Sequence, residues 1–191
     1  MRPFETGKRA LHHSWQSSYV PSDEVKEARS WSVDETSVNV KGNWCYLSRA
    51  IDRDGNLVDS MVSETRDREA AQRFFKQAAD VVGHRPERVT TDGHDAYPRA
   101  MRETLGSDVL HRTNRYLNHR LEQDHRGIKQ RYYPMRGFGS VASASRFCRA
   151  FDEVRQFFRV RTTMKQQVSL AHQREAFRHR LEALKAMVLV A

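Results

Sequence analysis

The feature that most constrains the fold is a change in the spacing of apolar residues along the chain. Residues 31–63 form three strand-like runs, the first with alternating apolar and polar side chains, separated by the turn sequences Lys41-Gly42-Asn43 and Asp52-Arg53-Asp54-Gly55-Asn56. A period of two is typical of strands, so this segment predicts a three-stranded antiparallel meander. From about residue 68 the apolar residues recur at helical spacing instead, and Gly83 is placed to end that helix.

The rest of the chain is predicted to alternate short strands with helices. We expect strands at 88–91 and 108–112, a helix between them at 96–105, and later helices at 117–132, 144–158 and 170–190. A meander followed by this alternation is the element order of a ribonuclease-H-like (retroviral-integrase-like) α/β fold, a mixed sheet flanked by helices. The last helix has near-heptad spacing, which fits packing within the molecule or a partner helix, and we favour packing.

Three parts follow from these patterns. Residues 1–30 are polar without a sustained period and predict a loose N-terminal arm, residues 31–161 form the α/β domain, and residues 162–191 form a C-terminal helical extension. No apolar run approaches the roughly 20 residues that cross a bilayer, so we expect a cytoplasmic protein with no membrane partner. Cys45 and Cys148 lack the spacing of a zinc site or a disulfide framework, and we expect both to be buried apolar residues.

The charge of the chain points to a polyanionic partner. Lys and Arg number 33 against 24 Asp and Glu, a formal net charge of +9, and such a surplus favours double-stranded DNA through counterion release. Basic residues concentrate around the helix predicted at 117–132. A solvated helix face would also look basic, but the acidic residues described next favour DNA contact for Arg115, Arg120, Arg126, Lys129 and Arg131.

Three acidic residues fall where this fold would bring them together. Asp34 lies in the first predicted strand, Asp92 ends the fourth, and Glu122 lies on the helix after the fifth. Taken singly, they read as an exposed strand residue, a turn residue and a solvated helix residue. Their joint placement predicts a cluster of hard oxygen ligands for Mg²⁺ or Mn²⁺. Two such ions can activate an attacking oxygen and stabilise a leaving one in phosphoryl transfer.

Three sequence blocks carry a family resemblance. The blocks VDETSVNVKGNWCYLSRAID, TTDGHDAY and LNHRLEQDHRGIKQR resemble those of the DDE transposases of bacterial insertion sequences, most closely the insertion-sequence-six family, over about residues 31–161. The resemblance implies that Asp34, Asp92 and Glu122 are the catalytic and metal-binding triad, and that Lys129 contacts a DNA phosphate. It also implies DNA strand cleavage and strand transfer by a homodimer or larger assembly on the bacterial nucleoid.

Two neighbours of Glu122 belong to the same block. Asp124 falls on the apolar stripe of its helix, so it is either paired within the structure or close to the active site. His125 is expected to be a structural or DNA-facing residue and not a metal ligand.

The chain departs from the family at its N-terminus. About 30 residues precede the first predicted strand, too few for the helix-turn-helix module of full-length relatives, so we expect a truncated copy. Two alternatives to an active catalytic core therefore stay open. One is an idle fragment that binds DNA, or pairs with a complete transposase and interferes with it. The other is a nuclease of the same fold.

Overall fold

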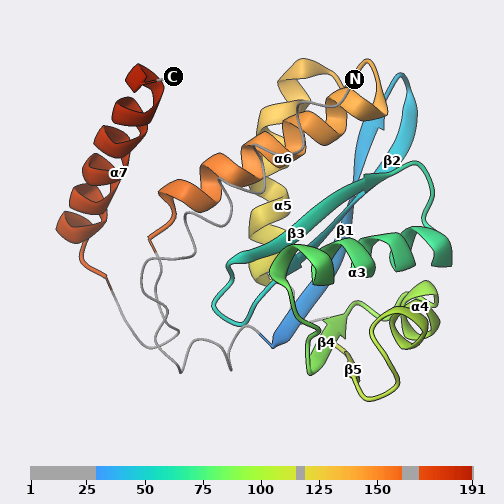
Figure 1. The fold of residues 1–191 in the computed structure, drawn as a ribbon. Coiled ribbons are helices and arrows are strands. Elements are labelled where there is room, and N and C mark those ends of the chain that lie inside the picture. Colours follow the sequence, from blue (N-terminus) through green and yellow to red (C-terminus); the bar gives the residue numbers. More distant parts are fainter. Residues whose placement is uncertain (1–28, 115–118, 161–167, 191) are drawn as a thin grey trace.

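A computed structural model describes residues 29–114, 119–160 and 168–190 of the chain, in which a central sheet is flanked by helices (Figure 1). The predicted N-terminal arm lies almost wholly outside the described residues. In chain order the elements are β1 Ser30–Val40, β2 Asn43–Ile51, β3 Leu57–Ser63, α3 Arg68–Val82, β4 Arg88–Thr91, α4 Ala96–Thr104, β5 Leu110–Thr113, α5 His119–Tyr132, the 3₁₀ helix η1 Tyr133–Met135, α6 Val141–Phe158 and α7 Leu170–Val190.

The sheet has five strands in the order β3-β2-β1-β4-β5. The pairs β1–β2 and β2–β3 are antiparallel, whereas β1–β4 and β4–β5 are parallel. The antiparallel meander is therefore extended on one side by two strands that return through helices α3 and α4. This is the ribonuclease-H-like arrangement that the element order predicted.

The β1–β2 turn sets the register of the sheet. Lys41 and Gly42 both have positive φ, 51° and 84°, and Val40 pairs with Asn43 across this two-residue loop. Positive φ at both central positions is the type I′ pattern, whose twist matches that of the flanking strands. The register that follows places Asp34 directly opposite Arg49 on β2.

The sheet has an apolar core on each face. Helices α3 and α4 cover one face, with a core of Trp31, Val33, Ala50, Val58, Ala71, Phe74, Phe75, Ala78, Val89, Tyr97, Ala100, Met101, Leu105 and Val109. Helices α5 and α6 cover the other, with a core of Val38, Val40, Cys45, Leu47, Ile128, Tyr132, Phe138, Ala144 and Cys148. Alternate residues of β1 point to opposite faces. Both cysteines are free and buried, as predicted.

Helix ends follow the chemistry of the sequence. Asp67 caps the start of α3 by accepting from the Ala70 N–H at 2.7 Å, and Gly83 ends the helix with φ 76°. At α6, Ser140 and Ser143 form a reciprocal capping box. Val154, an apolar residue of α6, is exposed.

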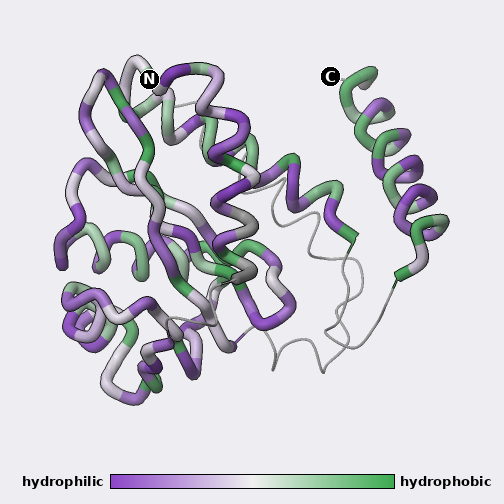
Figure 2. Tube along the Cα trace, turned by 180° about the vertical axis from the view of Figure 1, so that it is seen from behind, coloured by the Kyte–Doolittle hydropathy of each residue, from purple (hydrophilic) through white to green (hydrophobic). Residues whose placement is uncertain are grey.

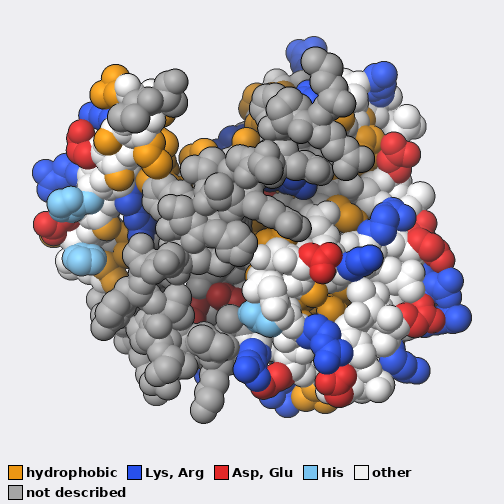
Figure 3. Space-filling model, in the orientation of Figure 1, with side chains coloured by type: hydrophobic (Ala, Val, Ile, Leu, Met, Phe, Trp, Pro, Cys, Tyr) orange, Lys and Arg blue, Asp and Glu red, His pale blue; other side chains and the backbone are white. Residues whose placement is uncertain are grey.

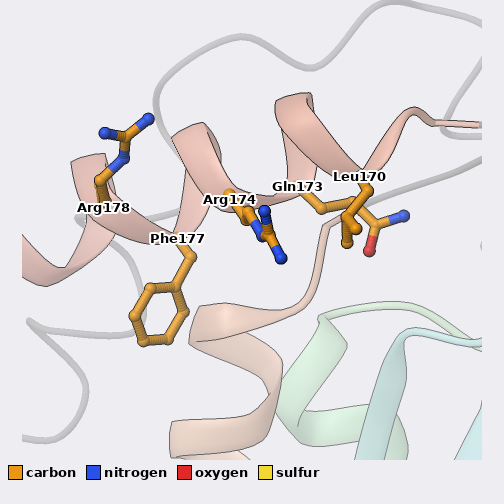
Figure 4. A pocket seen from close by; sticks show the side chains of 5 residues that line it. All are labelled: Leu170, Gln173, Arg174, Phe177 and Arg178. Atoms are coloured by element: carbon orange, nitrogen blue, oxygen red, sulfur yellow. The ribbon is translucent and has the colours of Figure 1, made fainter.

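Helix α7 spans the predicted residues, but its apolar side chains are not packed as we expected. Phe177 contacts Phe158 at the end of α6, with ring centroids 4.8 Å apart, but Phe177 is still exposed, as are Leu170, Leu184 and Val188. Hydrophobic and hydrophilic segments alternate along α7 (Figure 2). A hollow of about 600 Å³ is lined by residues of α7, and no carboxylate is among them (Figure 4).

Among the described residues, no helix is long and apolar enough to span a membrane.

Candidate active site

Asp34 and Asp92 lie level with each other on neighbouring strands. In the parallel β1–β4 pair Ser32 is opposite Thr90, so two residues further along each strand Asp34 is level with Asp92. Strand β4 ends at Thr91, while β1 continues to Val40. The end of β4 therefore places Asp92 at the point where β1 carries Asp34, as the sequence predicted.

A tight turn fixes the backbone after Asp92. The Asp92 carboxylate accepts a hydrogen bond from the His94 N–H at 3.1 Å, and Gly93 has φ 94°. A Cβ at Gly93 would lie 2.5 Å from the Thr113 side chain on β5. Glycine is therefore required both for the left-handed backbone and for the close approach of β5.

Glu122 lies in the first turn of α5, and its side chain is exposed. It is near enough for its charge to act on the Asp34 carboxyl. Within the described ranges, however, no group of three His, Cys, Asp or Glu side chains is gathered so that it could hold a metal ion. The sharing of metal ions by the three acids stays a prediction, and the Asp124 side chain lies outside what the structure describes.

Three other acids lie near enough to the Asp34 carboxyl for their charges to act on it. Its side chain is 16% exposed, and burial raises its pKa to about 6, although the hydrogen bond from the Glu35 N–H at 2.9 Å acts against the increase. The charges of Asp92, Glu35 and Glu122 raise the pKa further. Each of these neighbours disfavours the ionised carboxylate, so a cation bound here would relieve repulsion.

His125 packs against Asp34 from α5. The two side chains approach to 3.8 Å between Nδ1 and Oδ2. Burial lowers the pKa of His125 to about 3, and the charges of Arg49 and Lys129 contribute. The imidazole is therefore neutral near pH 7, and the 3.8 Å approach is a polar contact without an ion pair. Of the two roles expected from the sequence, structural or DNA-facing, its burial favours the structural one.

A buried ion pair lies behind Asp34, and sequence reasoning missed it. The Arg49 guanidinium donates to the Asp152 carboxylate on α6 at 2.5 Å, and the two side chains are 2% and 1% exposed. Since Asp34 and Arg49 are cross-strand partners, this pair ties α6 to the sheet beside the candidate site. The turn at Lys41-Gly42 could have indicated that Arg49 lies opposite Asp34, but it carries no signal for the pairing of Arg49 with Asp152.

A second arginine, also missed, contacts two acids of the site. Arg66, in the loop between β3 and α3, donates to Glu35 at 2.5 Å and to Asp92 at 3.3 Å. Glu35 follows Asp34 on β1 and points to the opposite face of the sheet. A loop arginine has no periodic signal, so its sequence position did not reveal these contacts.

The predicted DNA-binding residues lie on or before α5. Arg126 and Arg131 are exposed and Lys129 is half-buried, whereas Arg115 and the Arg120 side chain lie outside what the structure describes. Arg131 also packs within the fold, with its guanidinium 5.6 Å from the centre of the Phe151 ring. On the face that carries α3 and α4, basic and acidic side chains are intermingled (Figure 3). Contact with DNA stays a prediction for the basic residues on and before α5.

The chain is similar in sequence to insertion-sequence transposases of Staphylococcus aureus. The transposase for insertion sequence-like element IS431mec is 35% identical over 136 residues, covering 63% of this chain and 60% of the relative. The transposase for insertion sequence element IS257 in transposon Tn4003 matches with the same identity and coverage. The chain thus spans about 60% of the length of these relatives.

Its fold is also found among solved structures. A chain of the simian T-cell lymphotropic virus intasome, in complex with PP2A regulatory subunit B56 gamma, aligns with a TM-score of 0.51 at 14% identity. The alignment covers 74% of this chain and 52% of that one. A family model described as a DDE domain matches residues 28–161. Because that match takes in β1 to α6 and all three acidic blocks, the chain belongs to the DDE domain family of insertion-sequence transposases.

Proposed function

We propose that this chain is a catalytic core for DNA transposition, which cleaves a DNA strand at an element's end and joins the freed 3′-hydroxyl to target DNA. The observation that carries the proposal is the placement of Asp34 on β1 level with Asp92 directly after β4, with Glu122 on α5 acting electrostatically on Asp34. Family membership supports the same reading. Double-stranded DNA is the proposed substrate, and a homodimer or larger assembly on DNA is the proposed active form.

The residues present fit a divalent metal by their chemistry. Asp34, Asp92 and Glu122 offer carboxylate oxygens, which hard cations such as Mg²⁺ and Mn²⁺ prefer. The raised pKa of Asp34 has causes, burial and neighbouring negative charge, that a bound cation would offset. When bound, such ions would supply charge stabilisation to the attacking and leaving oxygens.

The protein's own groups have separable tasks in this proposal. Asp34 lies within β1 and Asp92 directly follows the last residue of β4, so the pairing of these two strands sets the separation of the two residues. His125 limits the movement of the Asp34 side chain by packing against it. Lys129 lies seven residues after Glu122, nearly two helical turns, so both side chains share one face of α5. On that face Lys129 can bind the DNA phosphate beside the reacting bond.

A strand-transfer assay with pre-cleaved ends and Mn²⁺ tests the proposal. Wild-type protein should join the ends to target DNA, and Asp92→Asn should abolish joining, since it removes one ligand charge while keeping the size of the side chain. DNA binding and the metal-free melting temperature of this variant should change little. Asp80→Asn is the matched control, because Asp80 is exposed on α3 and away from the named acids.

Two outcomes would contradict the proposal. Joining activity that persists in Asp92→Asn would exclude the assigned ligand role of this residue. Absence of joining and nicking in the wild type, together with intact DNA binding, would favour the idle fragment described above.

A further inference from the structure

Arg66 occupies an unusual position for a residue outside the acidic triad. Its Nε donates to Glu35 Oε2 at 2.5 Å, and its Nη2 donates to Asp92 Oδ2 at 3.3 Å. One guanidinium thus contacts a proposed metal ligand and the residue next to another. In the protein alone, the positive charge of Arg66 therefore already lies beside the acids of the site.

The two contacts of Arg66 are unequal. Glu35 is 9% exposed and also accepts a hydrogen bond from Ser48 at 3.3 Å, so its carboxylate is held in place. Asp92 is 34% exposed, and its contact with Arg66 is longer and open to solvent. Charge pairs that water can reach are weak, whereas a shorter contact with a shielded carboxylate is stronger. Glu35 is therefore the anchor of Arg66, and Asp92 is the partner that can be exchanged.

We propose that Arg66 is an exchangeable counterion, which competes with the divalent cation for Asp92 and remains on Glu35 when the cation binds. This inference rests on the proposed function, because it assumes that Asp92 is a metal ligand. Arg66 comes from the loop between β3 and α3 and is 35% exposed, so its guanidinium can leave Asp92 without disturbing either core.

A competing role and a supporting role for Arg66 predict opposite changes in metal affinity when Arg66 is removed. If Arg66 only held Asp92 in position, removing it would weaken metal binding. If Arg66 competes with the cation, removing it should strengthen binding, since the carboxylates lose an internal positive charge and the incoming ion displaces nothing. Interactions of exposed charges at this separation support an increase in affinity of about threefold to tenfold.

Mg²⁺ titration of the DNA-free protein at constant ionic strength, followed by calorimetry and by the melting temperature, measures this effect. We expect Arg66→Ala to bind Mg²⁺ about threefold to tenfold more tightly than wild type. Arg66→Lys keeps the charge and should remain within about twofold of wild type. Arg99→Ala is the matched control, because Arg99 pairs only with the exposed Glu103 among the interactions that the structure describes for it.

Asp92→Asn completes the test by removing the contested carboxylate. In this background Arg66→Ala should no longer increase Mg²⁺ affinity, because competition at Asp92 has been removed. Arg66→Gln, which keeps a polar side chain, replaces Arg66→Ala if circular dichroism shows that the alanine variant is misfolded, and the same increase is expected.

The possible results separate the two proposals. Unchanged or weaker Mg²⁺ binding by the folded Arg66 variants, with normal binding by wild type and loss in Asp92→Asn, would overturn the counterion role alone. If wild type and Asp92→Asn bind Mg²⁺ equally, or neither binds it, the proposed metal site fails and the counterion role fails with it.

Discussion

Replacing Asp152 by Asn is the sharpest test of how the sheet is held behind the candidate site. The change keeps the size of the side chain but removes the charge that faces Arg49. The guanidinium is 2% exposed, so it would be left buried without an opposing charge from α6. Its Nε and Nη1 have no hydrogen-bond partner among the described residues, which makes the Nη2 contact with Asp152 the more important.

The expected loss of stability is large. Breaking a buried ion pair by removing one partner costs about 3 to 5 kcal/mol, because an uncompensated charge remains inside the protein. With a urea dependence of about 2 kcal/mol per M, the unfolding midpoint should fall by about 1.5 to 2.5 M. Urea denaturation followed by circular dichroism measures this shift.

Two further variants make the Asp152 prediction specific. Glu153→Gln changes the adjacent exposed acid and should alter the free energy of unfolding by no more than about 0.5 kcal/mol. The double variant Arg49→Met with Asp152→Leu removes both charges and should recover most of the lost stability, since apolar residues of similar volume can replace a buried pair. A loss below about 1 kcal/mol in Asp152→Asn would refute the reasoning, because the guanidinium would then not depend on that charge.

Three other predictions follow from the site and the helices. The folded pKa of Asp34, about 6, lies above its ordinary 3.8, so its contribution to stability is fully present below pH 3.8 and is lost as pH rises through 6. In metal-free buffer, Asp34→Asn should therefore gain roughly 2 to 3 kcal/mol relative to wild type between pH 4 and 7, and a constant difference in urea denaturation would contradict this. Lys129→Ala should lower DNA affinity on all sequences and reduce the salt slope by about one unit, measured by fluorescence anisotropy; an unchanged slope would exclude phosphate contact. Ser140→Ala should destabilise the protein by about 1 kcal/mol through loss of the α6 capping box, and an unchanged melting temperature would argue against that cap.

The sequence predicted the fold well wherever local periodicity was strong. The strands predicted from NWCYLSRAI and LVDSMVS coincide with β2 and β3. Buried and partly exposed residues alternate along most of β3, whereas β2 is buried throughout from Leu47 to Ile51 and was recognised by its position between two turn sequences. Strand β5 was predicted at 108–112 but spans Leu110–Thr113. Among the described strands it pairs only with β4, and most of its residues are exposed, so burial leaves little pattern in its sequence.

The candidate site was predicted less completely than the fold. Asp34 and Asp92 could be placed from strand order alone, since each lies on or directly after a strand. Arg49 and Asp152 are 103 residues apart, and their pairing depends on how α6 packs on the sheet, which periodicity does not specify. The sequence also did not distinguish the adjacent Tyr132 and Tyr133, of which Tyr132 is buried and Tyr133 is exposed and contacts the Tyr132 ring edge-on.

The pairing of the two arginines beside β1 explains why a bound cation would stabilise the ionised form of Asp34 most among the acids of the site. Because β1 alternates, Asp34 and Glu35 face opposite sides of the sheet. On one side the Arg49 charge is matched by Asp152, and on the other Arg66 is matched first by Glu35. Among the described residues, Asp92, Glu35 and Glu122 are the charges that act most strongly on the Asp34 carboxyl, and burial deprives it of water. A bound cation would therefore favour ionisation of the Asp34 carboxyl more than that of the neighbouring acids. Arg49 and Arg66 do not take this role, because they pair with Asp152 and Glu35.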